Sequence, residues 1–186
     1  FLSNAAKLNH RQLGRVFEWF QKSLRVIGAD ELSPYLSAYS AARAKEDKES
    51  QERIRRLLAV ADFGISGFDI REETYTEKDL PEDMPAELRN QLINKKHLDV
   101  YMRHPVGSSN EVALPLEEES NGTRRLFALS GPLAEVLENG WTLFVDELDA
   151  SLHPLLVRYL VELFHNPQIN PKGAQLIFNT HDTTLM

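Results

Sequence analysis

The sequence predicts an α/β protein with a mostly parallel sheet, and a strand–helix–strand pattern in its last third carries this prediction. Residues 143–145 (Leu-Phe-Val) and 176–178 (Leu-Ile-Phe) are short apolar runs, typical of strands buried on both faces of a parallel sheet. Residues 154–164 between them repeat apolar side chains at helical spacing. We expect these helical side chains to face inward: Leu155, Tyr159, Leu160 and Leu163. The pattern predicts a βαβ unit with a right-handed crossover.

Upstream of this unit the chain alternates between helical and extended patterns. We expect helices over residues 12–24, 35–61, 86–96 and 122–137, and strands over residues 24–27, 68–72, 98–102 and 112–116. Gly64 is the expected stop of the second helix, and residues 107–110 the expected link between the last two strands. The charged stretch 43–56 is interpreted as a solvated helix face, because its heptads are too few to sustain a coiled-coil arm.

Composition excludes several classes of function. A chain of 186 residues can bury a substantial core, and its net charge of −7 argues against a broadly basic surface for nucleic acid, with a local patch left open. The absence of cysteine excludes disulfides, thiolate metal sites and cysteine nucleophiles, and fits a cytoplasmic protein. The longest apolar run is far short of a membrane span, so we expect no membrane association.

Polar residues follow both strands of the predicted βαβ unit. Asp146 and Glu147 end the first strand, and residues 179–182 (Asn-Thr-His-Asp) end the second. Ligands of open parallel sheets bind at the carboxyl ends of the strands. This set suits Mg²⁺-assisted hydrolysis of a phosphoanhydride: Asp146 would hold the metal, Glu147 would orient or deprotonate water, and His181 would donate to the terminal phosphate. Taken singly, the acids could simply mark a strand exit into solvent and His181 could be structural.

Four segments in a fixed order carry a family resemblance. Residues 143–147 look like a Walker B motif with its catalytic glutamate, residues 151–154 (Ser-Leu-His-Pro) are similar to a D-loop, and residues 179–181 resemble a switch-histidine loop. Residues 119–124 (Glu-Ser-Asn-Gly-Thr-Arg) open the preceding helix, where ABC-class ATPases carry their signature. Over residues 117–183 the chain therefore resembles bacterial AAA-family ATPases of the ABC superclass, related to OLD and SMC-type proteins, some of which serve in anti-phage defence.

The resemblance implies an ABC-type half-fold that works with ATP and Mg²⁺. It divides the chain into a helical and antiparallel middle segment, 1–110, and a lobe with the signature, Walker B, D-loop and switch-histidine segments, 111–186. It implies that Glu147 and His181 are catalytic and that Asp146 binds the metal. The implied nucleotide-binding residues are Ser120, Asn121, Gly122 and Ser151.

The signature also implies a homodimer. In the family the signature helix faces the γ-phosphate held by the opposite subunit, and a helix N-terminus attracts anions through its free N–H groups. The structural interpretation of Glu119 and of the run Glu117–Glu118 is that acids near a helix N-terminus favour the helix dipole. An effector protein or DNA is left open as a further partner.

The chain departs from the family pattern in three ways. Asn121 replaces the first glycine of the transporter-type signature, and His153 stands where many relatives have an aspartate; the OLD-like branch tolerates both. None of the nine glycines is followed by lysine, so the Gly-x-x-x-x-Gly-Lys loop that cradles phosphates is missing. We expect that loop upstream of Phe1 and expect these 186 residues alone not to be competent. A degenerate ATPase is the other interpretation.

Two further functions are compatible with these residues. A metal-dependent nuclease or phosphohydrolase could use Asp146, Glu147, Asp149 and His181 as ligands, and it would need no phosphate-binding loop. A non-enzymatic assembly scaffold is also conceivable, but a scaffold has no need of intact Asp146, Glu147 and His181.

Overall fold

A computed structural model describes residues 1–8, 10–28, 34–60, 64–81, 83–107 and 110–183. The chain forms two compact units, which we treat separately: unit 1 combines residues 1–36 with 132–186, and unit 2 is residues 37–131. The fold is α/β, as predicted, with one parallel and one antiparallel three-stranded sheet. The division at residue 110, between the middle segment and the lobe with the ATPase motifs, stays a prediction from the resemblance.

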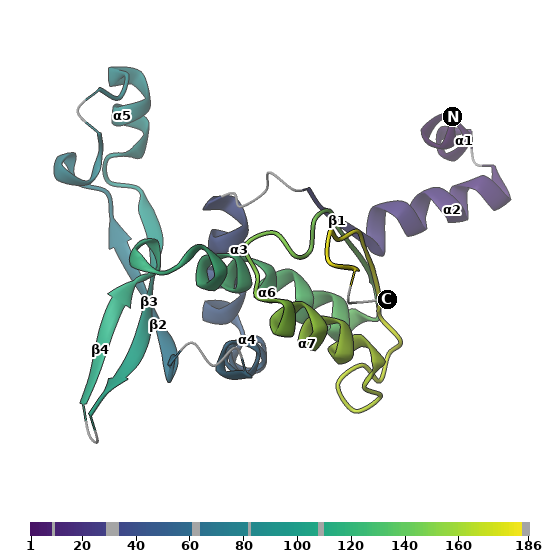
Figure 1. The fold of residues 1–186 in the computed structure, drawn as a ribbon. Coiled ribbons are helices and arrows are strands. Elements are labelled where there is room, and N and C mark those ends of the chain that lie inside the picture. Colours follow the sequence, from purple (N-terminus) through teal and green to yellow (C-terminus); the bar gives the residue numbers. More distant parts are fainter. Residues whose placement is uncertain (9, 29–33, 61–63, 82, 108–109, 184–186) are drawn as a thin grey trace. The chain divides into compact units, whose positions relative to one another are not determined.

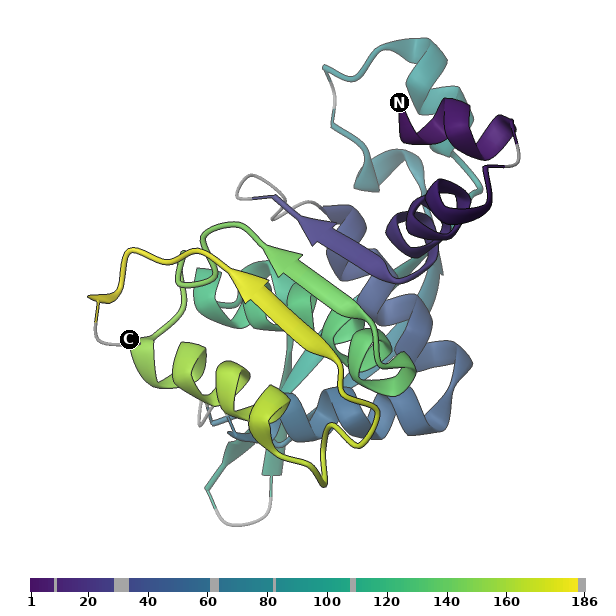
Figure 2. The same cartoon turned by 90° about the vertical axis from the view of Figure 1, so that its right-hand side faces the viewer.

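Unit 1 is built on the parallel sheet. Its strands are β1 (Leu24–Ile27), β5 (Thr142–Val145) and β6 (Gln175–Phe178), in the order β1-β5-β6. Figure 2 shows these strands, purple, green and yellow, side by side and pointing the same way. Val145 pairs with both Ile27 and Phe178, so the three strands end in register. The predicted parallel pairing of residues 143–145 with 176–178 is confirmed.

Helix α7 (Pro154–His165) connects β5 to β6. It begins where predicted, with Pro154 in the first turn and the His153 side chain accepting a hydrogen bond from the Leu155 amide at 3.3 Å. The buried stripe consists of Leu156, Val157, Leu160 and Leu163. The inward placement of Leu155 was wrong, because this residue lies in the first turn and is 67% exposed.

The parallel sheet is buried on one face only, which corrects the prediction for its strands. Ile27, Leu143 and Val145 are at most 3% exposed, whereas Val26 is 60% and Ile177 48% exposed. Successive strand residues point to opposite faces, so the alternation identifies one covered and one uncovered face. Apolar content alone therefore overstated the burial of β6.

The first helices of unit 1 are α1 (Leu2–Lys7) and α2 (Arg11–Lys22). Helix α2 confirms the helix predicted over residues 12–24, and β1 follows it as expected. The His10 side chain caps α2 by accepting from the Leu13 amide at 3.3 Å. Of the residues that the structure describes, none forms a helix long and apolar enough to cross a membrane.

Unit 2 contains the antiparallel sheet, β2 (Gly67–Thr74), β3 (Lys96–Val106) and β4 (Asn110–Pro115), in the order β2-β3-β4 (Figure 1). The short 3₁₀ helix η1 (Glu77–Asp79) and α5 (Ala86–Leu92) lie between β2 and β3 in sequence, and η2 (Leu116–Glu118) follows β4. The three predicted strands are confirmed. The helix predicted to run to Lys96 ends at Leu92, because Asn94 adopts a φ of 63° and β3 starts at Lys96. Part of the predicted link 107–110 lies outside the described residues.

The single helix predicted over residues 35–61 is two helices, α3 (Pro34–Glu46) and α4 (Lys48–Val60). Asp47 causes the break, since its carboxylate accepts from the backbone amides of Glu49 at 3.2 Å and Ser50 at 2.7 Å. Such side-chain-to-backbone bonds favour a new helix start over helix continuation. The solvated interpretation of the charged stretch holds for α4, where Glu49 and Glu52 pair with arginines at the surface. Residue 61 lies outside the described residues.

Helix α6 (Asn121–Asn139) contributes Leu126, Phe127, Ala128 and Leu129 to the core of unit 2, and its residues from Pro132 on belong to unit 1. Phe127 is fully buried and meets Phe68 of β2 edge to face, with ring centroids 5.6 Å apart. Ser40 of α3 donates from Oγ to the Ala128 carbonyl at 2.9 Å and accepts from the Gly131 amide at 3.0 Å. A side chain at residue 131 would collide with Ser40, so glycine permits this close approach.

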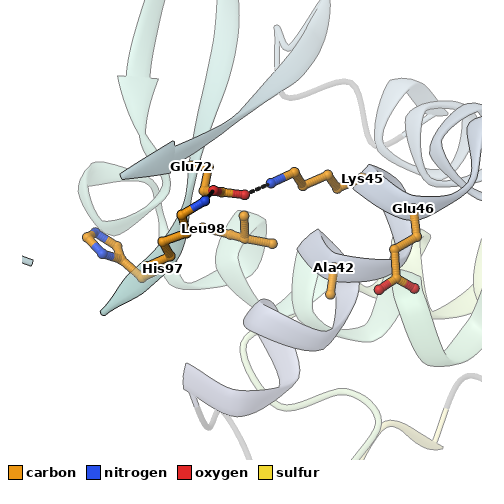
Figure 3. A pocket seen from close by; sticks show the side chains of 7 residues that line it. Ala42, Lys45, Glu46, Glu72, His97 and Leu98 are labelled. Carbon is orange, nitrogen blue, oxygen red and sulfur yellow. Dashed lines mark hydrogen bonds and ion pairs between the residues drawn. The ribbon is translucent and has the colours of Figure 1, made fainter. Parts of the chain in front are cut away.

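An ion-pair cluster joins α3 to the antiparallel sheet within unit 2. Glu72 of β2 binds Lys45 of α3 (Figure 3). It also binds Lys96 of β3, at 2.5 Å. Together with neighbouring residues of α3 and β3, they line a pocket of about 440 Å³. The two ammonium groups lower the pKa of Glu72 from 4.5 to about 2, chiefly through the hydrogen bond from Lys45.

Candidate functional site

Asn179 fixes the carboxyl ends of β5 and β6 to each other. Its side-chain Nδ2 donates to Oδ1 of Asp146, and its Oδ1 accepts the backbone N–H of Glu147. The Asn179 carbonyl also accepts the Leu148 amide at 3.1 Å. Asn179, the residue directly after β6, therefore orients both acidic residues that follow β5.

Glu147 has an unusual backbone conformation. Its φ is +51°, in the left-handed region that a residue with a Cβ rarely adopts. Such a conformation costs on the order of 1–3 kcal/mol and persists where surrounding contacts hold it, often at functional sites. Here the contact is the hydrogen bond from the Glu147 amide to Asn179. Asp146 still belongs to the strand ladder, because its backbone amide donates to the Ile27 carbonyl at 2.8 Å. At Glu147 the backbone turns away from the strand direction.

The imidazole of His181 lies beside the carboxylate of Glu147. His181 Nε2 and Glu147 Oε1 are 3.6 Å apart, with the two side chains 82% and 44% exposed. The His181 backbone amide donates to both carboxylate oxygens of Asp149, at 3.2 and 3.3 Å. Asp149 thus holds the loop after β6 against the loop after β5, and it brings His181 toward Glu147.

The loop from β5 to α7 consists of consecutive turns. The Ala150 amide donates to the Glu147 carbonyl at 3.0 Å, and the Leu152 amide to the Asp149 carbonyl at 3.1 Å. Ser151 is exposed and has a φ of +60°. Leu152 is 8% exposed and anchors the loop, so Ser151 is presented to solvent at its tip.

The remaining predicted site residues lie at the start of α6 in unit 2. Ser120 precedes the helix and caps it, because its Oγ accepts the Thr123 amide at 3.1 Å. That Oγ also shares a hydrogen bond with the Thr123 hydroxyl at 2.9 Å. The Asn121 side chain accepts from Arg124, and Gly122 follows in the first turn. This geometry exposes Ser120 and Asn121 at a helix N-terminus, where anions bind favourably.

The structure brings Asp146, Glu147 and His181 together at one end of the parallel sheet, with Ser151 in the same loop as the two acids. Ser120, Asn121 and Gly122 belong to unit 2. The sequence pointed to Asn179 as a strand-end residue and to Asp149 as a possible metal ligand, but not to the hydrogen bonds by which they organise the site. The contact of Asn179 with Asp146 could have been found from the strand register, since Val145 pairs with Phe178 and the following residues, Asp146 and Asn179, must then be neighbours.

Asp146 fits the kind of ligand that Mg²⁺ takes. Mg²⁺ typically binds one or two carboxylates and completes its shell with water and substrate phosphate. The described hydrogen bond to Asn179 uses only Oδ1 of Asp146. Protein side chains alone do not form a metal site in the described part of the chain: no three acidic or histidine side chains there group closely enough to hold a metal ion. Asp149 binds a backbone amide instead, so the nuclease alternative with four joint ligands is not supported.

The sequence matches one family along almost its whole length. A family model described as "AAA domain, putative AbiEii toxin, Type IV TA system" matches residues 4–186. The matched range includes every predicted site residue, all of unit 2 and all of unit 1 except residues 1–3. No curated protein matches the chain.

Solved structures of SMC heads are similar to the chain at low identity. The SmcHead bound to the C-winged helix domain of ScpA has a TM-score of 0.49 at 14% identity, covering 87% of this chain and 48% of that one. The Smc head domain with an extended coiled coil, bound to the C-terminal domain of ScpA derived from Pyrococcus furiosus, has 0.43 at 16%, covering 73% and 29%. A structure from work on ATP-driven dimerization and DNA-stimulated activation of SMC ATPases has 0.45 at 17%, covering 79% and 76%. The chain spans about half the length of the first of these heads and less of the second.

Proposed function

Because the chain belongs to the AAA-domain family whose model it matches, we propose that it carries the hydrolytic residues of an ATP-binding and ATP-hydrolysing protein. The observation that carries the proposal is the pairing of Glu147 and His181, 3.6 Å apart, next to Asp146 at the carboxyl ends of parallel strands. Ligands of open parallel sheets bind at that end.

Glu147 is the residue that we assign to the attacking water. Its carboxylate is 44% exposed, so water can reach it, and Asn179 fixes the backbone from which it projects. A carboxylate within hydrogen-bonding distance of a water orients that water and accepts its proton as the phosphorus–oxygen bond forms. The left-handed backbone at Glu147 supports this role, because strain of this kind is retained where function requires the geometry.

His181 and Asp146 take complementary roles at the phosphate. His181 can donate a hydrogen bond to a terminal phosphate oxygen, where negative charge accumulates in the transition state. Asp146 would hold Mg²⁺, which supplies charge neutralisation across the phosphate oxygens when bound. Asn179 keeps the Asp146 carboxylate oriented toward this edge of the sheet. Ser151, exposed at the loop tip, is assigned to nucleotide contact.

The start of α6 is assigned to the nucleotide of a second subunit. Ser120, Asn121 and Gly122 present a capped helix N-terminus, which favours a phosphate by charge and by its amide groups. In the ABC pattern that these residues resemble, this contact acts between subunits, so we propose an ATP-dependent homodimer. The cytoplasmic location, the role in anti-phage defence or DNA-related processes, and an effector protein or DNA as partner stay predictions from the resemblance.

The test is ATP hydrolysis by the full-length protein and its Glu147→Gln variant. We expect the variant to bind ATP while its kcat falls by roughly 10²–10⁴-fold, the usual contribution of a general base. Glu162→Gln is the matched control, because Glu162 is exposed on α7. It should hydrolyse ATP at the wild-type rate. Wild-type turnover in Glu147→Gln would remove Glu147 from its role, and no ATP binding by the wild-type protein would overturn the proposed function.

A further inference from the structure

We propose that His104 is a positioning residue that withdraws the carboxylate of Glu119 from the start of α6 and so keeps that helix end open to a phosphate. The inference rests on the proposed function, because it names a determinant of nucleotide affinity at the same site. His104 lies on β3, well before the signature-like segment in sequence, and nothing in that segment's pattern points to it.

The His104–Glu119 contact is close and shielded. His104 Nε2 and Glu119 Oε1 are 2.6 Å apart, and the side chains are 23% and 9% exposed. The preceding acids, Glu117 and Glu118, are exposed on η2. Of these three consecutive acids, Glu119, which adjoins Ser120, is the partly buried one, and it lies against a histidine.

The position of Glu119 explains why its carboxylate needs a partner. It is the residue directly before Ser120, whose Oγ caps the helix by accepting the Thr123 amide. A carboxylate released at this point would be attracted to the same helix N-terminus that we assign to a phosphate. It would compete for the amide donors there and repel the phosphate. Held by His104, the carboxylate is anchored to β3 instead.

The backbone around Glu119 is consistent with an anchored side chain. Its amide donates to the Leu116 carbonyl at 3.2 Å, and its φ and ψ of −75° and 163° are extended, so the chain turns from η2 into α6 at this residue. Leu116 is 5% exposed and fixes the other side of the turn. From this turn the Glu119 side chain reaches His104.

The test compares ATP dependence in full-length variants. We expect His104→Ala to raise the KM for ATP, and the ATP concentration for half-maximal dimerisation, by roughly tenfold, with kcat within about twofold of wild type. His104→Gln should restore most of the affinity, because its amide can donate to Glu119. Adding Glu119→Gln to His104→Ala should also lower the KM again, because it removes the competing charge.

The control is His97→Ala on the same strand. His97 forms a comparable pair with Asp99 at 3.1 Å, and its side chain is 20% exposed. The His97→Ala substitution should lower the free energy of unfolding without raising the KM for ATP. A KM unchanged in His104→Ala, or no recovery when Glu119→Gln is added, would show that the pair only stabilises the fold and would overturn the proposal. If the wild-type protein neither binds ATP nor dimerises with it, the proposed function itself fails and the inference falls with it.

Discussion

The side-chain amide of Asn179 donates a hydrogen bond to the carboxylate of Asp146, joining the exits of two neighbouring parallel strands. The same side chain accepts the amide of Glu147, whose φ is positive. A single neutral residue therefore orients a proposed metal ligand and a proposed general base. Its amide can donate and accept at once, which neither an aspartate nor an alanine can do.

Substituting Asn179 should impair hydrolysis more than stability. Asn179→Ala removes both bonds, and Asn179→Asp places a second negative charge against Asp146, so we expect kcat to fall at least about tenfold in each, with Asn179→Asp the weaker enzyme. Steady-state ATP hydrolysis by the full-length protein measures this. Asn139→Ala is the control, since Asn139 is exposed at the end of α6 and bonds only to the Glu135 carbonyl among the described contacts. Equal activity in Asn179→Ala and wild type would contradict the assignment.

Two glycine-to-alanine substitutions should shift stability in opposite directions. A Cβ at residue 131 would lie 2.5 Å from Ser40 Oγ and 2.7 Å from Ser40 Cα, so Gly131→Ala should lower the free energy of unfolding by about 1–3 kcal/mol. Gly14 lies within α2 with nothing within 4 Å of such a Cβ, so Gly14→Ala should raise it by about 0.5–1 kcal/mol. Urea unfolding measures both. A stabilising Gly131→Ala would show that α3 and α6 do not approach as described.

The Glu72 cluster should be visible in a pH titration. The pKa of Glu72 is lowered to about 2 by its hydrogen bonds from Lys45 and then Lys96. Because the folded pKa lies below the unfolded value, the stabilisation is fully present above about pH 4.5 and is lost as the pH falls through about 2. Lys45→Met should move the pKa of Glu72 toward 4.5, as measured from its side-chain carboxyl carbon by NMR.

Glu52 provides the internal control for that titration. Its pKa is also lowered to about 2, but by Arg55 and Arg56 on its own helix. Lys45→Met should leave it unchanged. Titration of Glu72 near 4.5 in the unsubstituted protein would mean that the cluster does not form in solution.

The parallel sheet and its acidic edge could be predicted because local patterns determine them. The apolar runs of β5 and β6 and the helix between them suffice to place Asp146 and His181 at the same edge. The role of Asn179 could not be predicted with the same ease, because it depends on which residues of two strands stand opposite each other. The left-handed backbone of Glu147 has no signal in the sequence either, since it arises from that contact.

Other features escaped prediction because one side chain or one distant contact decides them. The helix predicted over residues 35–61 divides at Asp47. Its carboxylate accepts hydrogen bonds from backbone amides that follow it, and a new helix starts there. The pairing of His104 with Glu119 joins a strand to a helix start and appears only when β3 is placed. The exposed face of the parallel sheet, at Val26 and Ile177, looks in sequence like any buried strand.

The most direct test of the account is the mass of the full-length Glu147→Gln protein with and without ATP, measured by analytical ultracentrifugation in the presence of Mg²⁺. Because the variant lacks the general base but should still bind ATP, it should stay in the ATP-bound state. We therefore expect a dimer with ATP and a monomer without it. Adding Ser120→Arg should return the protein to a monomer, because it blocks the start of α6. A Glu147→Gln protein that stays monomeric at saturating ATP, or a dimer indifferent to Ser120→Arg, would contradict the account.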